Sequence, residues 1–120
     1  MDITTAERAL AQLVAQWSGL ELDRTVLCGG GDVPAAAPLV LVRFIAGRPA
    51  GEESLADFVA EVRGSFAEPG EAQEFVAAVW GALPRYGVSG FADLDDGGKL
   101  ELAEHKGFFT VAGRVRARFA

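Results

Sequence analysis

Three short stretches of the chain carry residues whose types could do chemistry, and the first is Gly29-Gly30-Gly31-Asp32. A glycine-rich loop can wrap a phosphate with its backbone N–H groups, but a Walker-type loop also needs a Lys-Ser or Lys-Thr pair entering a helix. Here the glycines run into Val-Pro-Ala-Ala-Ala-Pro, which cannot continue as a helix because of its prolines. The sequence therefore favours a flexible connection between two strands over a phosphate site.

The second stretch holds Asp93, Asp95 and Asp96, which resemble a fragment of a calcium-binding loop. Calcium takes about six oxygen ligands, and the distal Glu of such a loop is missing at the required offset after Gly97. We therefore expect an exposed hairpin turn here and assign no metal ligand.

The third stretch, Glu104-His105-Lys106-Gly107, contains the only histidine of the chain, and Cys28 is the only cysteine. A catalytic Cys–His pair needs its two side chains within hydrogen-bond reach, and nothing in the sequence brings these two together. A single cysteine excludes an internal disulfide, and a single histidine excludes a multi-histidine metal centre within one chain. The sequence assigns no catalytic, cofactor-binding or metal-ligating residue, and we expect a protein that is not an enzyme.

The distribution of charge is more informative. Residues 52–74 include seven acidic residues and one basic residue, whereas residues 106–120 include four basic residues and no acidic one. The basic residues of the second segment are Lys106, Arg114, Arg116 and Arg118. The net charge of −6 argues against broad nucleic-acid binding, and it also disfavours a single-strand platform built from the three arginines and Phe108.

Two interpretations of this asymmetry stay open. Asp57 and Glu61 can pair with Arg114 or Arg116 across neighbouring strands, each pair contributing about a few tenths of a kcal/mol. Alternatively, acidic and basic patches on different sides of the subunit let copies associate head to tail. Such a contact closes into a ring if the rotation fits.

The elements that position these residues begin with a helix from about Thr4 to Ser18, where apolar residues recur at helical spacing. Thr4 and Glu7 have the spacing of a capping box, and Gly19 is placed to end the helix. Two strands follow, a short one at 24–28 and a stronger one at 38–46. The second is nearly continuous in its hydrophobicity, which suggests either burial on both faces or a central place in the sheet.

The stretch from Leu55 to Phe66 fits both a helical stripe and a strand alternation. Gly64 and the alternation of polar residues favour the strand. A second helix is predicted from about Pro69 to Leu83, closed by Pro84.

The C-terminal third is predicted to be β-structure. Strands at 88–94 and 100–103 flank a tight turn at 95–98, and a final strand at 108–119 alternates clearly. The expected order is α-β-β-β-α-β-β, an α+β domain with a mainly antiparallel sheet and two amphipathic helices packed on one face. The predicted core comprises Leu10, Leu13, Val14, Trp17, Leu41, Phe58, Phe75, Val79, Trp80, Phe109, Val111 and Val115.

The length of 120 residues fits one domain, residues 1–120, and 50% apolar residues suffice for a core. No apolar run is long enough to span a bilayer, and the start Met-Asp-Ile-Thr-Thr lacks the pattern of a signal peptide. These features are typical of a soluble cytoplasmic protein and do not by themselves name a function.

Several local sequences add to this order of elements. They are the helix end Trp17-Ser18-Gly19-Leu20, the loop 29–38 before the apolar strand 39–45, the strand 58–64 before the helix 71–83, and the aromatic, alternating and basic last strand 107–119. Together they resemble the small phage tail terminator family, with the related minor capsid (tail completion) proteins of siphophages and prophages. The resemblance spans nearly the whole chain. Two segments depart from it: the loop 29–38 is unusually rich in Ala and Gly, and 48–54 is shorter and more acidic.

The resemblance implies a structural role with no catalysis and no cofactor. Tail terminators form a ring, usually a hexamer, on the head-proximal end of the tail tube, where they stop tube polymerisation and meet the head connector. The implied partners are further copies of the chain, the tail tube protein and the head-connector protein, with no membrane and no sequence-specific nucleic acid. The implied location is the cytoplasm of the bacterial host and then the tail–head junction of the virion.

A ring needs two different complementary faces on each subunit. We therefore expect Arg114, Arg116 and Arg118 to contribute to a ring or tube contact with an acidic patch containing Asp57, Glu61 or Glu71. An α+β adaptor or chaperone-like interaction module of a secretion or injection machine is the alternative, and a small enzyme or ligand-binding domain is a third. A closed ring of identical copies favours the terminator, and a monomer bound to a different protein favours the adaptor.

Overall fold

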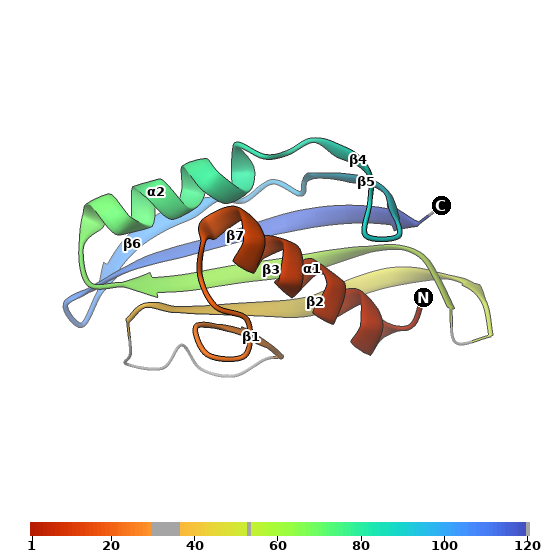
Figure 1. Ribbon diagram of the computed structural model, residues 1–120, viewed down its shortest axis with the longest axis horizontal. Helices are drawn as coiled ribbons and strands as arrows, with labels where there is room; N and C mark the ends of the chain where they lie inside the picture. The colour runs from red at the N-terminus through yellow and green to blue at the C-terminus, as the bar shows by residue number, and fades with distance from the viewer. Residues whose placement is uncertain (30–36, 53, 120) are drawn as a thin grey trace.

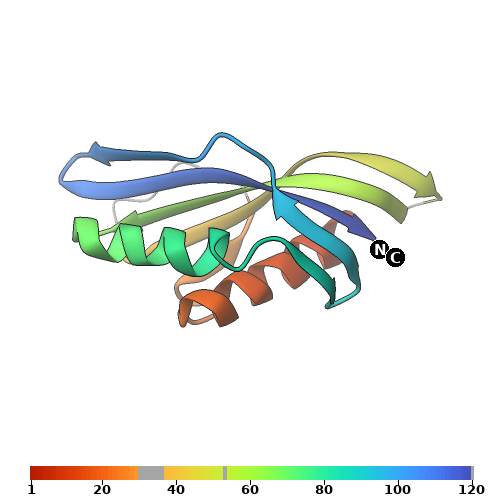
Figure 2. The ribbon, with the colours of Figure 1, turned by 90° about the horizontal axis from the view of Figure 1, so that it is seen from above.

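The computed structural model describes residues 1–29, 37–52 and 54–119, which form two layers (Figure 1). One layer is a seven-stranded sheet, and the other consists of two helices that cover the same face of it, as Figure 2 shows. The elements are α1 (Ile3–Ser18), β1 (Val26–Cys28), β2 (Leu39–Gly51), β3 (Ser54–Phe66), α2 (Pro69–Trp80), β4 (Arg85–Val88), β5 (Phe91–Asp96), β6 (Glu101–His105) and β7 (Phe108–Phe119). The predicted α+β class, the order α-β-β-β-α followed by β-strands, and the placement of both helices on one face are confirmed, although four strands rather than two follow α2.

The strand order in the sheet is β1-β2-β3-β7-β5-β4, with β6 also paired to β7. Every pair is antiparallel except β1 with β2. The long strands β2, β3 and β7 form the centre, and β3 confirms the strand interpretation of residues 55–66. Neither described helix combines the length and the apolar composition that a membrane crossing requires.

The tight turn predicted at residues 95–98 is wrong. β5 and β6 do not pair with each other but follow one another along β7, β5 beside its C-terminal half and β6 beside its N-terminal half. The Gly97 N–H still donates to the Arg114 carbonyl at 2.9 Å. A Cβ on Gly97 would lie 2.9 Å from the Arg114 Cβ, so a larger residue could not approach β7 this closely. The chain reverses instead at residues 89–90 and 106–107, so the C-terminal β region holds four strands.

The capping box predicted for Thr4 and Glu7 is also wrong. The helix begins earlier, and Asp2 caps it by accepting a 2.7 Å hydrogen bond from the Thr5 N–H. The Glu7 carboxylate instead accepts a 2.7 Å hydrogen bond from the Phe44 N–H of β2. At the other end, Gly19 closes α1 with a φ of 74°, as predicted.

The second helix is shorter than expected, because its last residues tighten. The N–H groups of Ala82 and Leu83 donate to carbonyls three residues back, at 3.2 Å each. This is the pattern of a 3₁₀ turn, and it ends α2 at Trp80.

The core lies between the two layers. Eight of the twelve predicted core residues are buried, and Trp17, Trp80 and Phe109 pack against them while partly exposed. The prediction that Leu41 belongs to the core is wrong. Val40 and Val42 face the helices, so Leu41 faces the opposite side of the sheet and is only half-buried. Burial of β2 on both faces is therefore wrong, because no described helix covers its second face (Figure 2). The alternative prediction, a place inside the sheet, is confirmed, because β2 lies between β1 and β3.

Candidate functional site: a charged, helix-free face of the sheet

The face of the sheet turned away from α1 and α2, which we call the open face, carries charged side chains from four neighbouring strands. Strand alternation explains why: on β3, Phe58 and Ala60 point into the core, so Asp57 and Glu61 point outward. The charged residues of the open face include Arg43 and Arg48 on β2, Asp57 and Glu61 on β3, Arg114, Arg116 and Arg118 on β7, and Asp93 and Asp95 on β5.

The strand register arranges these charges in alternating stripes. One row across the sheet reads Arg48, Asp57, Arg118, Asp93, each residue directly opposite the next. Along the strands, β2 and β7 are basic where β3 and β5 are acidic, although Arg63 adds one positive charge near the end of β3. Directly opposite residues on antiparallel strands share a face, so every acidic residue of the row lies beside an arginine of the same subunit.

Ion pairs within the subunit use much of this charge. One Glu61 oxygen lies 3.0 Å from Arg43 Nη2 and 3.1 Å from Arg63 Nε. Asp93 pairs with Arg118 at 2.6 Å. Asp57 and Glu61 thus pair with arginines of a neighbouring strand, but the partners predicted for them are wrong: the ion pairs are with Arg48 and Arg43 of β2 and not with Arg114 or Arg116 of β7.

Asp57 is a carboxylate of the open face that Arg48 holds through two contacts. It accepts a 2.7 Å hydrogen bond from Arg48 Nε and pairs with Arg48 Nη2 as well. The Arg48 hydrogen bond, assisted by the charges of Arg48 and Arg116, holds the pKa of Asp57 below its ordinary value.

The arginine stripe of β7 consists of Arg114, Arg116 and Arg118, and the first two have no ion-pair partner, within the part of the chain that the structure describes, that neutralises their charge. Among the described residues, no carboxylate lies within 4.0 Å of the Arg114 or Arg116 guanidinium. Arg116 is exposed and sits between Val59 and Asp95 in the register. Arg114 lies opposite Glu61, whose carboxylate is turned to Arg43 and Arg63 instead.

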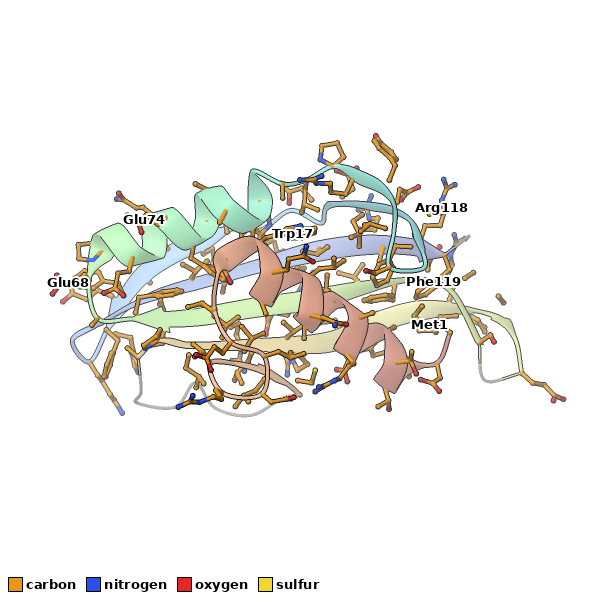
Figure 3. All side chains as sticks on the ribbon, viewed as in Figure 1. Met1, Trp17, Glu68, Glu74, Arg118 and Phe119 are labelled. Atoms are coloured by element: carbon orange, nitrogen blue, oxygen red, sulfur yellow. The ribbon has the colours of Figure 1, made fainter. Side chains whose placement is uncertain are left out.

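Glu71 lies apart from the other five predicted interface residues. It is exposed on α2, in the helix layer, on the far side of the sheet from the arginine stripe. Figure 3 places Glu68 just before the start of the same helix, Glu74 along it, and Arg118 at the far end of β7. Glu71 and Glu74 also border a pocket of about 320 Å³ between the end of α1 and α2, whose floor includes Leu20, Phe66 and Phe75.

The chemical candidates of the sequence do not form a site. Asp93 pairs with Arg118, the Asp95 carboxylate accepts the Asp96 N–H at 2.8 Å, and the Asp96 carboxylate accepts the Gly98 N–H at 2.7 Å. Within the part of the chain that the structure describes, no three His, Cys, Asp or Glu residues gather as a metal site would require. The glycine-rich stretch 29–32 falls outside the described residues beyond Gly29.

The only cysteine and the only histidine are held apart. Cys28 is on β1, at one edge of the sheet, and His105 ends β6, on the other side of β7. Loss of water around the thiol and then the nearby Glu7 carboxylate raise the pKa of Cys28, which makes it a poorer nucleophile.

Sequence reasoning missed Arg43 and Arg48 as members of the open face. The two are five positions apart, an odd number that places residues on opposite faces of a regular strand. A register shift between Phe44 and Ala46 restores them to the same face. The sequence carries no clear signal for that bulge.

The chain matches no protein-family model, and a search of the curated proteins finds no match either.

Proposed function

We propose that the chain is a structural subunit of a virion, a tail terminator of a phage or prophage that forms a ring, caps the tail tube and joins it to the head connector. The observation that carries the proposal is that two arginines of the open face have no carboxylate partner among the described residues, while two exposed acidic residues lie in the other layer. Arg114 and Arg116 are available on the open face, and Glu71 and Glu74 are exposed on the helix layer. The family resemblance over nearly the whole chain adds the phage context.

A heterologous contact joins two different surfaces, so it needs complementary features that cannot satisfy each other within one subunit. The sheet separates the arginines of β7 from the acids of α2, so these groups can meet only between copies. In this arrangement Asp57 and Glu61 hold Arg48 and Arg43 in place on the open face, and the α2 acids are the acceptors on the neighbour.

Exposed ion pairs are each worth only about 0 to 1 kcal/mol. The contact must therefore also bury apolar surface, and the open face offers the half-buried side chains of Leu41, Ile45 and Val59. Charge selects the orientation of the two copies, while apolar burial supplies most of the affinity.

The test is light scattering coupled to size exclusion over a range of protein and salt concentrations, with negative-stain images of the largest species. Closed rings near six copies support the proposal. Arg116→Glu should abolish them, Arg116→Glu combined with Glu71→Arg should restore them, and Arg24→Glu is the matched control on an exposed side chain far from the stripe.

Rings that persist unchanged in Arg116→Glu contradict the proposed contact. A strict monomer that also fails to bind tail tubes contradicts the terminator function and favours the adaptor.

A further inference from the structure

We propose that β6 is a docking edge for a second copy of this chain, which adds its own β6 antiparallel to it about a two-fold axis. The inference goes beyond the proposed ring contact, because it concerns the rim of the sheet rather than the arginines of β7 and the acidic residues of α2. It rests on the backbone geometry of β6, on the condition of the other sheet edges and on the residues that the pairing would bring together.

All five residues of β6 are exposed, and β6 pairs only with β7 among the described strands (Figure 1). Its connection to β7 is a two-residue turn at Lys106 and Gly107, whose φ values are 51° and 82°. Positive φ at both positions is the geometry of a type I′ hairpin, in which the closing pair, here His105 and Phe108, is hydrogen-bonded.

Hydrogen-bonded and non-hydrogen-bonded pairs alternate along an antiparallel ladder. Glu101 and Ala103 therefore bond to β7 like His105, while the N–H and C=O groups of Leu102 and Glu104 point away from the sheet. β6 thus offers two donors and two acceptors along a straight edge.

The other edges of the described sheet are poorly suited to pair with a further strand. On β1, the Val26 N–H donates to the Glu21 carbonyl and the Val26 carbonyl accepts from the Asp23 N–H, at 2.9 and 2.8 Å. On β2, register shifts and Pro49 break the regular edge. β4 has only four residues and includes Gly87 at a φ of 62°.

Because those edges are protected, the edge of another copy that best matches β6 is β6 itself. Antiparallel pairing with Ala103 on the two-fold axis places Leu102 opposite Glu104 of the second copy, so all four outward groups on each strand find a partner. It also places Glu101 opposite His105 of the second copy, on both sides of the axis. A carboxylate and an imidazole can hydrogen-bond to each other. When β6 pairs antiparallel with a second β6, these complementary side chains therefore face each other.

Leu102 supplies apolar surface for the contact. The residue is 52% exposed and borders a groove of about 290 Å³ between β6 and α2. Ala72, Gln73 and Phe109 also line this groove, which leaves room for the leucine of the second copy.

Disulfide trapping tests the register directly. In a Cys28→Ser background, Ala103→Cys puts the only thiol of each copy on the axis, where facing residues are close enough for a disulfide. We expect an oxidised dimer on a non-reducing gel. Glu101→Cys is the matched control, because the two copies of residue 101 lie about 13 Å apart in this pairing and cannot be bridged. Equal cross-linking of both variants overturns the proposal, as does none with Ala103→Cys.

Leu102→Pro, added to the Ala103→Cys variant, removes one outward N–H and leaves the bonds to β7 intact. It should reduce the disulfide dimer at least tenfold, with an unchanged circular dichroism spectrum. Undiminished dimer overturns the edge pairing. A third measurement needs no variant: the amide exchange of Leu102 and Glu104 in the wild-type chain should slow with rising protein concentration, and concentration-independent exchange contradicts the proposal.

The outcome is separable from that of the ring. Arg116→Glu should leave the Ala103→Cys dimer unchanged, so either contact can fail while the other stands.

Discussion

The Glu7 carboxylate of α1 accepts a hydrogen bond of 2.7 Å from the backbone N–H of Phe44 on β2. β1 pairs with β2 only as far as Val42, so Phe44 follows directly after the point where the neighbouring strand ends. A helix side chain thus satisfies the backbone donor that β1 does not reach. The same contact fixes the position of α1 along the sheet.

Glu7→Ala should therefore destabilise the fold by roughly 1.5 to 3 kcal/mol, the range for a hydrogen bond to a charged group. Urea unfolding measures the change. Glu7→Gln keeps an acceptor oxygen and should cost less, and Gln12→Ala, on the exposed side of the same helix, is the control with little effect. If Gln12→Ala and Glu7→Ala cost the same, the contact does not contribute.

Asp2→Ala should cost about 1 kcal/mol, because the first turn of α1 loses its capping carboxylate. Thr4→Ala, at an exposed position inside the helix, should change the free energy of unfolding by no more than about 0.5 kcal/mol. Thermal unfolding of the two variants shows whether Asp2, the observed cap, or Thr4, the predicted one, contributes more to stability. A larger loss of stability in Thr4→Ala than in Asp2→Ala would contradict the Asp2 cap and support the predicted capping box.

Gly113→Ala should destabilise the protein by about 1 to 3 kcal/mol, because the added Cβ would lie 2.4 Å from the Trp80 ring. Gly70→Ala, where nothing lies within 4 Å, is the control and should be neutral or slightly stabilising. Adding Trp80→Leu to Gly113→Ala should recover part of the loss. Strictly additive costs in the double variant would show that the two side chains do not collide.

Acid should weaken the fold partly through Asp57. Its pKa is lower in the folded protein than in the unfolded chain, because of Arg48. The unfolded state therefore binds its proton first as pH falls, so the stabilisation present above the ordinary carboxyl pKa is lost as pH drops through the lowered one. Asp57→Asn should flatten the dependence of Tm on pH below about pH 5. Glu52→Gln, at an exposed position, controls for the removal of one carboxylate, and an equal flattening there would contradict this assignment.

The fold was largely predictable because its strongest patterns are local. The alternation of β7 and the spacing of apolar residues in α1 each follow from one element packing one face against a core. These patterns gave the helices, the long strands and most of the buried side chains. The charge asymmetry likewise pointed to the arginines of β7.

What could not be predicted depends on contacts between elements. Glu7 has the spacing of a capping residue, and only the proximity of Phe44 explains its different partner. The residue types of Asp95–Gly98 favour a tight turn. No such turn forms, because both flanking strands pair with β7 instead of with each other. The faces of Arg43 and Arg48 depend on a bulge, which is decided by the pairing of β2 with β3.

For the proposed ring contact, the alternation of basic and acidic stripes on the open face governs how fast copies can find each other. Stripes of opposite sign only one strand apart cancel within a short distance, so an approaching copy first meets the net charge of −6. Like charges slow the encounter, and salt shortens the reach of that repulsion from about 30 Å at 0.01 M to about 8 Å at 0.15 M. Association between copies should therefore accelerate as salt is added, while the contact between the β7 arginines of one copy and the α2 acids of the next acts only at short range and sets the lifetime of the complex.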